Sequence, residues 1–458
     1  MRRLARLVRA IVVLASSATP ALRAQAVHDA ASDSAAVART AWRDAASASS
    51  LAVALPLAER AAIAWPMQPV YWTTLARLAT RAADTVRFAR AMRMLERFQL
   101  APTIRADSAL WRGVQQLRPQ DTARIASLAR ELRAGRLLTT IADSTVFAEG
   151  IDADQRTGTL YVASIRQRTV LAVRDGVSRD LGLHRDARVG AVFGVRVSPD
   201  GRTLWCTSVG HENAPGTATV AAVLLEVDAA TGAIRRVVPL PAAPAGRSRL
   251  PGDLVLSADG SVLISDSDAP AVLRYEPRTD RWEVFTDPRW RSPQGLAFIP
   301  GQHAMILADW SHGLFRLDLA TRAVTRVHVP DGITVLGLDG LTWYDGGVLA
   351  VQNGVEPARI VHITLTTAGT AVTAMRVVDR QPTLAPDPTI GTRVGNAYLY
   401  VANSQWHMYA NGARTQVPLT PTRLVCVPLT PARRSGTRST DSAPPPDASC
   451  KLSDAAAP

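Results

Sequence analysis

The sequence predicts a mainly β protein, a six-bladed β-propeller preceded by a small all-α domain of helical hairpins. Three observations support this fold class. One short phrase recurs along the C-terminal part of the chain at intervals of roughly 42 to 59 residues. Near residue 136 the spacing of apolar residues changes from a helical period of about 3.6 to a strand period of 2. Turns rich in Asp and Gly separate the predicted strands.

The recurring phrase begins with a residue of variable type, usually followed by Gly and then by an apolar–x–apolar strand. A repeat of this length holds four strands, which is typical of one propeller blade. Six such units across residues 137–430 predict six blades, and the stretch 137–141 is a candidate strand for closing the ring. The copies begin at Glu149, Phe193, Gly252, Gln294 and Asp339, with a looser sixth copy at Thr389.

Residues 1–26 have the pattern of a secretory signal peptide. Four Arg residues precede an apolar stretch over 10–22, which is too short to span a bilayer, and a small-x-small cleavage sequence follows at Ala24–Ala26. We therefore expect a mature chain that begins near Val27 and is periplasmic or secreted. No other apolar run is long enough for a membrane helix, so we expect no transmembrane segment after signal cleavage.

Residues 27–135 are rich in Ala, Leu and Arg with helical spacing, and they predict an α-helical domain. The stretch from Trp72 to Pro102 resembles a tetratricopeptide repeat. Two interpretations stay open for this domain, a plain helical cap and a peptide-binding groove. The helices are expected at about 35–48, 51–64, 70–83, 86–98, 105–116 and 121–134.

The bulk composition excludes several functional classes. The formal net charge is +13, yet the Arg residues are scattered and Lys451 is the single Lys, so no nucleic-acid partner is expected. The three Cys residues argue against a zinc site or a disulfide framework. We expect Cys206 and Cys426 to pack as small apolar residues, with a Cys426–Cys450 bridge as the less favoured alternative. Residues 431–458 lack an apolar rhythm and predict a disordered tail.

Propeller topology places the first residue of every innermost strand at one mouth of the central channel. Glu149, Gln294 and Asp339 would contribute two carboxylates and an amide oxygen there. Oxygen ligands of this kind suit a divalent cation, with Ca²⁺ favoured. The alternative is that each carboxylate pairs with an Arg or caps backbone amides.

The loops after the second strands should return to the same mouth, because neighbouring strands are antiparallel. They contain several His and Trp side chains, which could supply a general base and apolar walls. Asp253, His312 and His407 are the candidate catalytic residues. The alternative is that the His and Trp side chains only cover the surface of the blades.

Two copies of the phrase, Ala-Glu-Gly-Ile at 148–151 and Leu-Asp-Gly-Leu at 338–341, give residues 137–430 a resemblance to the SMP-30/gluconolactonase/LRE-like family of six-bladed propellers. The resemblance implies that Glu149, Gln294 and Asp339 hold a divalent cation that polarises a lactone carbonyl and activates a water. The chain departs from the family at two positions: Gln294 replaces an Asn, and Gly252 stands where an Asn is common.

These observations predict an exported, divalent-metal-dependent hydrolase that acts on a lactone or ester as its small-molecule substrate. The alternative is a non-catalytic propeller of the cell envelope. Such a protein would use the channel mouth or the helical domain to bind a peptide or glycan partner.

Overall fold

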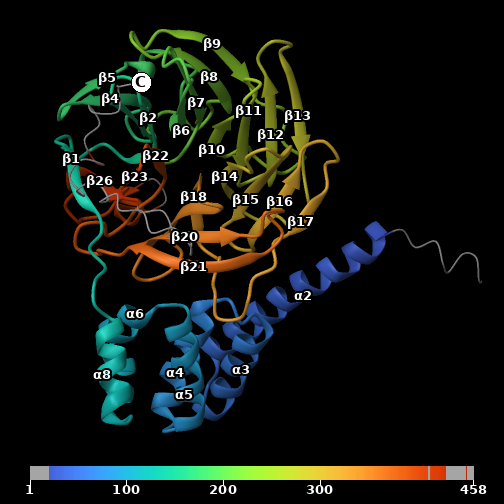
Figure 1. Cartoon of the computed structure of the whole chain (residues 1–458), viewed down its shortest axis with the longest axis vertical. Coiled ribbons are helices and arrows are strands. Elements are labelled where there is room, and N and C mark those ends of the chain that lie inside the picture. The colour runs from blue at the N-terminus through green and yellow to red at the C-terminus, as the bar shows by residue number, and fades with distance from the viewer. Residues whose placement is uncertain (1–19, 411–412, 430–449, 451–458) are drawn as a thin grey trace, which may run out of the picture. The chain divides into compact units, whose positions relative to one another are not determined.

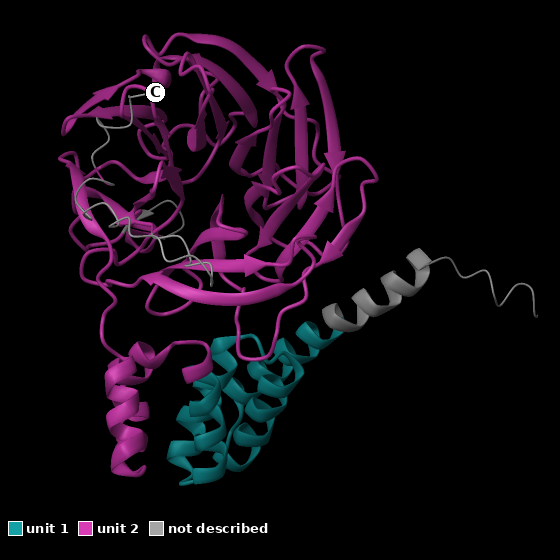
Figure 2. Cartoon of the chain, in the orientation of Figure 1, with its two compact units in different colours: residues 1–95 teal, residues 96–458 magenta. Residues whose placement is uncertain are grey.

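A computed structural model describes the backbone of residues 20–410, 413–429 and 450, and the side chains of residues 33–409, 415–429 and 450. The predicted tail lies outside these residues except for Cys450, and most of the predicted signal peptide lies outside them as well. The chain forms two compact units, residues 1–95 and 96–458 (Figure 2). Among the described helices, none has both the length and the apolar character that a membrane crossing requires.

The first unit consists of consecutive helices that pack through small side chains. Ala58, Ala61 and Leu75 are fully buried, so the helices approach one another closely. Arg87 of one helix pairs with Glu59 of another at 2.8 Å. The helices are α2 (Pro20–Ser47), α3 (Leu51–Ala64), α4 (Pro69–Arg81) and α5 (Thr85–Arg97), of which the last crosses the boundary between the units.

The second unit begins with three short helices and continues into six four-stranded sheets arranged as a propeller (Figure 1). The predicted fold class is therefore confirmed. The helices are α6 (Ala101–Ala106), α7 (Ser108–Gln115) and α8 (Pro119–Leu128). The compact unit thus contains these helices together with the propeller, although the change of hydrophobic period in the sequence falls near residue 136.

Each of the first five blades is an antiparallel meander of four consecutive strands. Blade one contains β2 (Ala148–Asp154), β3 (Thr159–Ser164), β4 (Thr169–Arg174) and β5 (Val177–Asp180). Blade two contains β6 (Ala191–Val197), β7 (Thr203–Val209), β8 (Val223–Asp228) and β9 (Ile234–Pro239). Blade three contains β10 (Pro251–Leu256), β11 (Val262–Asp266), β12 (Ala271–Glu276) and β13 (Arg281–Phe285). Blade four contains β14 (Pro293–Phe298), β15 (Ala304–Asp309), β16 (Gly313–Asp318) and β17 (Val324–Arg326). Blade five contains β18 (Leu338–Tyr344), β19 (Gly347–Gln352), β20 (Arg359–Leu365) and β21 (Val372–Asp379).

Blade six joins the two ends of the propeller. Its strands follow the order β22 (Gly391–Val394), β23 (Ala397–Val401), β26 (Thr422–Pro428) and β1 (Arg136–Ile141). The outermost strand β1 comes from the start of the propeller and pairs antiparallel with β26. The stretch 137–141 is thus the closing strand, as its sequence suggested. The small hairpin of β24 (Tyr409–Ala410) and β25 (Ala413–Arg414) lies in the long loop before β26.

The recurring phrase forms a β-bulge in the innermost strand. In five blades the pairing of the first and second strands is interrupted at the phrase, which re-aims the side chains there. The register shifts between Ala148 and Ile151, Val192 and Val195, Pro251 and Leu254, Pro293 and Leu296, and Leu338 and Leu341.

The Gly of the phrase is required by the close approach of neighbouring innermost strands. A Cβ atom on Gly150 would lie 2.4 Å from the carbonyl oxygen of Phe193, and one on Gly295 would lie 2.2 Å from that of Asp339. Only a residue without a side chain fits such a position. Blade three reverses the order, because Gly252 precedes Asp253 there.

The cysteines depart in part from the expectation. Cys206 is a buried free thiol, as predicted. Cys426 in β26 instead forms a disulfide with Cys450, although the sequence favoured independent packing. The bridge is built because both residues are buried in the same apolar cluster of blades one and six.

Candidate functional site

Two buried carboxylates from blades one and five meet in one polar network. Glu149 is 9% exposed and accepts a hydrogen bond at Oε2 from Trp406 Nε1 at 2.8 Å. Asp339 is 7% exposed and accepts at Oδ2 from Asn353 Nδ2 at 2.8 Å and from Thr389 Oγ1 at 3.2 Å. All these donors are uncharged. Within the described part of the chain, neither carboxylate forms an ion pair with an Arg.

The pKa values of the two carboxyls show that their charges are not balanced. Burial raises the pKa of Glu149 well above its usual range, and the negative charge of Asp339 raises it further. Burial also raises the pKa of Asp339 to about 6, and the charges of Asp253 and Asp387 add to that rise. Ionising both groups is therefore unfavourable unless a cation binds between them. Without a cation, the pair tends to retain a proton.

The loops after the second strands supply two of these neutral donors, and Thr389 precedes the first strand of blade six. Asn353 follows β19 and Trp406 follows β23, and both reach residues of the innermost strands. Asn353 also accepts a hydrogen bond at Oδ1 from Trp310 Nε1 at 3.0 Å, and the Trp310 side chain is 42% exposed. Two indoles are therefore connected to the carboxylates. Trp406 donates directly to Glu149, and Trp310 is linked to Asp339 through Asn353. The two sets of residues converge as propeller topology predicts.

His407 lies next to this network and is oriented by an aspartate. Its Nδ1 is 3.3 Å from Asp387 Oδ2, which also accepts from the backbone N of Trp406 at 2.9 Å. The His407 side chain remains solvent-accessible. Sequence reasoning missed Asp387, because it lies in an irregular loop before the loosest copy of the phrase.

Asp253 is engaged in a buried ion pair. Its Oδ1 lies 2.8 Å from a guanidinium nitrogen of Arg196, and both side chains are buried. Arg196 also donates to the carbonyl oxygens of Ile151 and Val195. Burial raises the pKa of Asp253, and the charge of Arg196 opposes that rise. Asp253 occupies the bulge position at which the other blades carry Gly.

His312 is buried in the turn between β15 and β16. Its backbone N donates to Asp309 Oδ1 at 2.9 Å, and Oδ2 of the same aspartate accepts from the backbone N of Ser292 at 2.9 Å. Asp309 thereby connects this turn to the start of blade four. The His312 ring lies beside the same carboxylate, with Nδ1 3.7 Å from Asp309 Oδ1.

Gln294 lies on blade four, next to Asp339 around the ring. Its Nε2 donates to Ser292 Oγ at 3.2 Å. Its Oε1 lies 3.6 Å from the position that a Cβ atom would take on Gly252. The structure brings Glu149 and Asp339 together, but in the described residues no hydrogen bond joins Gln294 to either carboxylate.

His211 belongs to an aromatic wall beside Glu149. Its ring packs edge-on against Phe193 at 5.4 Å and against Trp406 at 6.0 Å between centroids. Its Nδ1 accepts a hydrogen bond from the backbone N of Asn213 at 3.1 Å. Burial lowers the pKa of His211, which favours the neutral ring, and the charge of Glu212 opposes that shift. The sequence contained this His, but nothing in its local pattern set it apart from the others.

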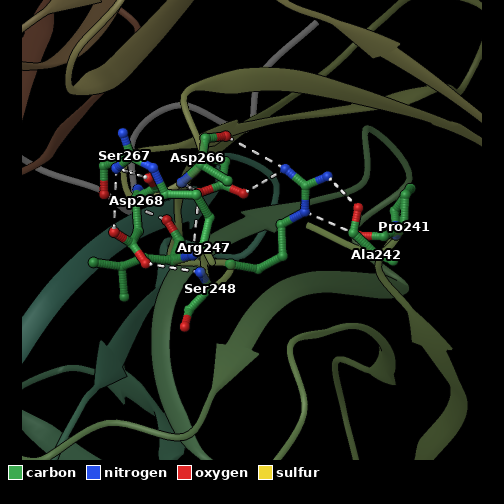
Figure 3. Close-up of polar contacts among 10 residues, drawn as sticks. Pro241, Ala242, Arg247, Ser248, Asp266, Ser267 and Asp268 are labelled. Atoms are coloured by element: carbon green, nitrogen blue, oxygen red, sulfur yellow. Dashed lines mark hydrogen bonds and ion pairs between the residues drawn. The ribbon is translucent and has the colours of Figure 1, made fainter. Parts of the chain in front are cut away.

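The acidic groups near Gly252 have structural partners. Asp266, at the end of β11, accepts from the backbone N of Leu250 and pairs with Arg249 at 2.9 Å. The same Arg249 donates to the carbonyl oxygens of Pro241 and Ala242. Figure 3 shows the polar contacts in this region, with Asp266, Pro241 and Ala242 labelled. These contacts hold the loop before blade three in place, so Asp266 is not available as a ligand.

The far ends of the innermost strands line a separate cavity of about 560 Å³. All six blades contribute to it, and Arg196 and Asp152 are among its lining residues. Asp152 is engaged there, because it accepts from Thr392 Oγ1 at 2.7 Å and from the backbone N of Val197 at 2.9 Å.

Among the described residues, no group of three or more His, Cys, Asp or Glu side chains is arranged to hold a metal ion. The unbalanced charge of Glu149 and Asp339 makes this acidic pair the candidate for cation binding at the mouth. Any further ligands would have to be neutral oxygens, from Gln294, Thr389, water or a substrate.

Comparison with known proteins identifies no family. No protein-family model matches the chain, and no curated protein matches it. Similar solved structures include the PQQ-bound aldose sugar dehydrogenase from Streptomyces coelicolor, with 15% identity and a TM-score of 0.44 over 65% of this chain and 99% of that one. Virginiamycin B lyase from Staphylococcus aureus has 13% identity and a TM-score of 0.42 over 65% and 98%. A putative oxidoreductase (glucose dehydrogenase) from Thermus thermophilus has 13% identity and a TM-score of 0.44 over 64% and 98%. At these values the similarities carry no information about activity.

Proposed function

We propose that the protein is a divalent-cation-dependent hydrolase of a small lactone or ester, of the SMP-30/gluconolactonase type. One observation carries the proposal: two buried carboxylates, Glu149 and Asp339, share a network whose donors are all neutral. Burial raises the pKa of Glu149, and the charge of Asp339 raises it further. A cation between them would remove the repulsion of the two carboxylates.

The residues present fit a hard cation such as Ca²⁺. The hydrogen bonds from Trp406 and Asn353 engage Oε2 of Glu149 and Oδ2 of Asp339. The second oxygen of each carboxylate, Oε1 and Oδ1, is then the natural ligand. Ca²⁺ accepts carboxylate, amide and water oxygens in flexible geometry, and two carboxylates with neutral oxygens are ligands of this kind.

A bound cation would supply Lewis-acid polarisation of the substrate carbonyl. The remaining tasks belong to side chains of this protein. Trp406 and Asn353 orient the carboxylates. His407, held at Nδ1 by Asp387, uses Nε2 to accept the proton of the attacking water. Asp253 and His312 have no part in this scheme, because the first pairs with Arg196 and the second is buried.

Calorimetric titration of Ca²⁺, and then of Mn²⁺ and Zn²⁺, into the EDTA-stripped full chain tests the cation site. We expect one-to-one binding that releases protons at pH 6, because the cation competes with protons for the acidic pair. Asp339→Asn should abolish it. Asp175→Asn, at a side chain that is 85% exposed, is the matched control and should bind normally. Absence of binding at millimolar metal would refute the proposal.

A screen of lactones and aryl esters with the metal-loaded protein tests the hydrolase activity. His407→Gln should lower kcat by about 10²- to 10⁴-fold without weakening metal binding, since His407 acts on the proton and not on the cation. His303→Gln, at an exposed histidine, should leave kcat unchanged. Metal binding without turnover of any ester or lactone would mean that the cation is structural.

One observation favours a second function, a non-catalytic propeller that binds a glycan or peptide. Trp310 exposes 42% of its surface beside the acidic network, and exposed indoles commonly stack on sugar rings or apolar side chains. A chain that binds no metal but retains a glycan or peptide through Trp310 would fit this alternative. In either case we propose an exported protein, and the Cys426–Cys450 disulfide supports an oxidising compartment.

A further inference from the structure

Two buried arginines of blade five have no acidic partner. Arg359 opens β20 and is 1% exposed, and Arg380 follows β21 and is 7% exposed. Both donate to the carbonyl oxygen of Gln99, each at 3.2 Å, so the two guanidinium groups are neighbours. In the part of the chain that the structure describes, neither forms an ion pair with a carboxylate.

Helix ends compensate these charges only in part. Arg359 donates to the carbonyl oxygen of Phe98 at 2.7 Å, just after α5, and Arg380 donates to that of Leu128 at 3.3 Å, the last residue of α8. The C-terminal end of a helix carries about half a negative charge, so two helices offer roughly one negative charge against two positive ones. About one positive charge remains unbalanced in a buried place.

Each guanidinium also has an unused donor. Arg359 Nη2 and Arg380 Nε are buried and have no hydrogen-bond partner. A buried donor without an acceptor is costly, and it normally indicates a bound water or ion. Burial lowers the pKa of Arg359 to about 9, and the charge of Arg380 contributes. The arginine nevertheless stays charged at neutral pH.

The nearest carboxylate in the sequence cannot supply the missing acceptor. Asp379 Oδ1 accepts from the backbone N of Ala134 and of Gly135, at 3.1 and 3.0 Å. Its Oδ2 accepts from Tyr400 Oη at 2.7 Å. Asp379 thus holds the chain just before β1 and leaves the two arginines without a counter-charge.

We propose that one small inorganic anion of the size and charge of chloride binds between Arg359 Nη2 and Arg380 Nε. Two free donor nitrogens, Nη2 with two N–H groups and Nε with one, and one excess positive charge match a monatomic anion. A phosphate or sulfate would bring four oxygens to a buried place that offers only these two donors. The anion would fasten residues 98–130, which contain α6–α8, to blade five, because both arginines also bind carbonyls of that segment.

Crystals of the full chain grown with sodium bromide in place of chloride test the site directly. The expected result is a bromine anomalous peak in contact with both Arg359 and Arg380. Ordinary water density without an anomalous signal at that position, or no density at all, would overturn the proposal.

The thermal unfolding midpoint provides a test in solution. At equal ionic strength, sodium chloride should raise Tm relative to sodium methanesulfonate, whose anion is too bulky for the site, by on the order of 2 °C or more. Arg380→Gln should abolish the difference, and Arg376→Gln on the exposed face of β21 should keep it. Equal Tm values in both salts would contradict the proposal. If Arg380→Gln does not fold, the bromide experiment on the unaltered protein decides.

Discussion

At the level of single residues, the channel mouth depends on a pair of carboxylates that the protein surrounds with neutral donors. Trp406, Asn353 and Thr389 orient Glu149 and Asp339 but do not balance their charge. A cation-free protein therefore keeps protons on this pair to a higher pH than usual. The unbalanced negative charge that favours a bound cation also makes the protonation of the cation-free pair depend on pH.

Asp339→Asn should remove a pH dependence of stability. The pKa of Asp339 rises from 3.8 to about 6 on folding, so the cation-free protein loses stability as pH rises from about 4 to about 6. Below pH 4 the group is protonated in both states and contributes nothing. Above pH 6 the loss is complete, at roughly 3 kcal/mol for about two pKa units. Urea unfolding of the unaltered protein and of Asp339→Asn, in EDTA at pH 4.5 and pH 7, measures this loss of unfolding free energy.

The comparison for that experiment is Asp175→Asn, whose exposed carboxylate should leave the slope between pH 4 and 6 as in the unaltered protein. An identical slope in Asp339→Asn would mean that Asp339 does not titrate in this range. Addition of the cation should suppress the slope, because a bound cation keeps the pair ionised at lower pH.

Some of these residues could be found from the sequence and others could not. Glu149 and Asp339 are recognisable because each opens a copy of the repeat, and a repeat assigns equivalent positions to its members. Asp387 and the pairing of Asp253 with Arg196 are not recognisable in this way. Those partners lie outside the repeat or on different blades, so no local pattern records them.

At the level of elements, the innermost strands owe their close spacing to the bulge glycines. Gly150 faces the carbonyl oxygen of Phe193 in the next blade at a distance that excludes a side chain. The repeated Gly of the sequence therefore indicates close contact between neighbouring blades and does not mark a turn. Periodicity could predict the strand, but the reason for the Gly appeared only when the neighbouring strand was in place.

Gly150→Ala and Gly252→Ala should differ sharply in stability. The new Cβ atom at 150 would lie 2.4 Å from the oxygen of Phe193, and we expect a loss of roughly 1–3 kcal/mol from overpacking. At 252 the nearest atoms are the side-chain oxygens of Gln294 and Ser265, at 3.6 and 3.7 Å, so the change should stay within about 0.5 kcal/mol. Urea unfolding of both variants at pH 7 measures the difference, and equal losses would contradict this account of the bulge.

At the level of the whole molecule, the ring is closed by pairing β1 with β26, and a disulfide supports the same blade. Cys426 lies in β26 and is bonded to Cys450 across 24 residues. The bridge and the closing strand both act on β26, so loss of either should weaken blade six. The sequence showed the candidate closing strand, but the Cys426–Cys450 bridge was only the less favoured alternative there.

Cys450→Ser should lower the free energy of unfolding by roughly 3 kcal/mol, the amount expected for a loop of this length. Dithiothreitol should lower Tm of the unaltered protein to a similar extent and leave the variant unaffected, which serves as the internal control. Differential scanning calorimetry with a parallel thiol titration measures both. If Tm is unchanged once the titration shows full reduction, the bridge does not stabilise the ring.

The sequence by itself determined the helical start, the strands, the number of blades and the place of Glu149 and Asp339 within them. These features follow from hydrophobic periodicity and turn chemistry, which act between residues close in the chain. Only the tertiary structure decided which polar groups meet. Trp406 reaches Glu149 across 257 positions, and Arg359 reaches Phe98 across 261. Contacts at such separations depend on how the blades close, and no local sequence pattern specifies them.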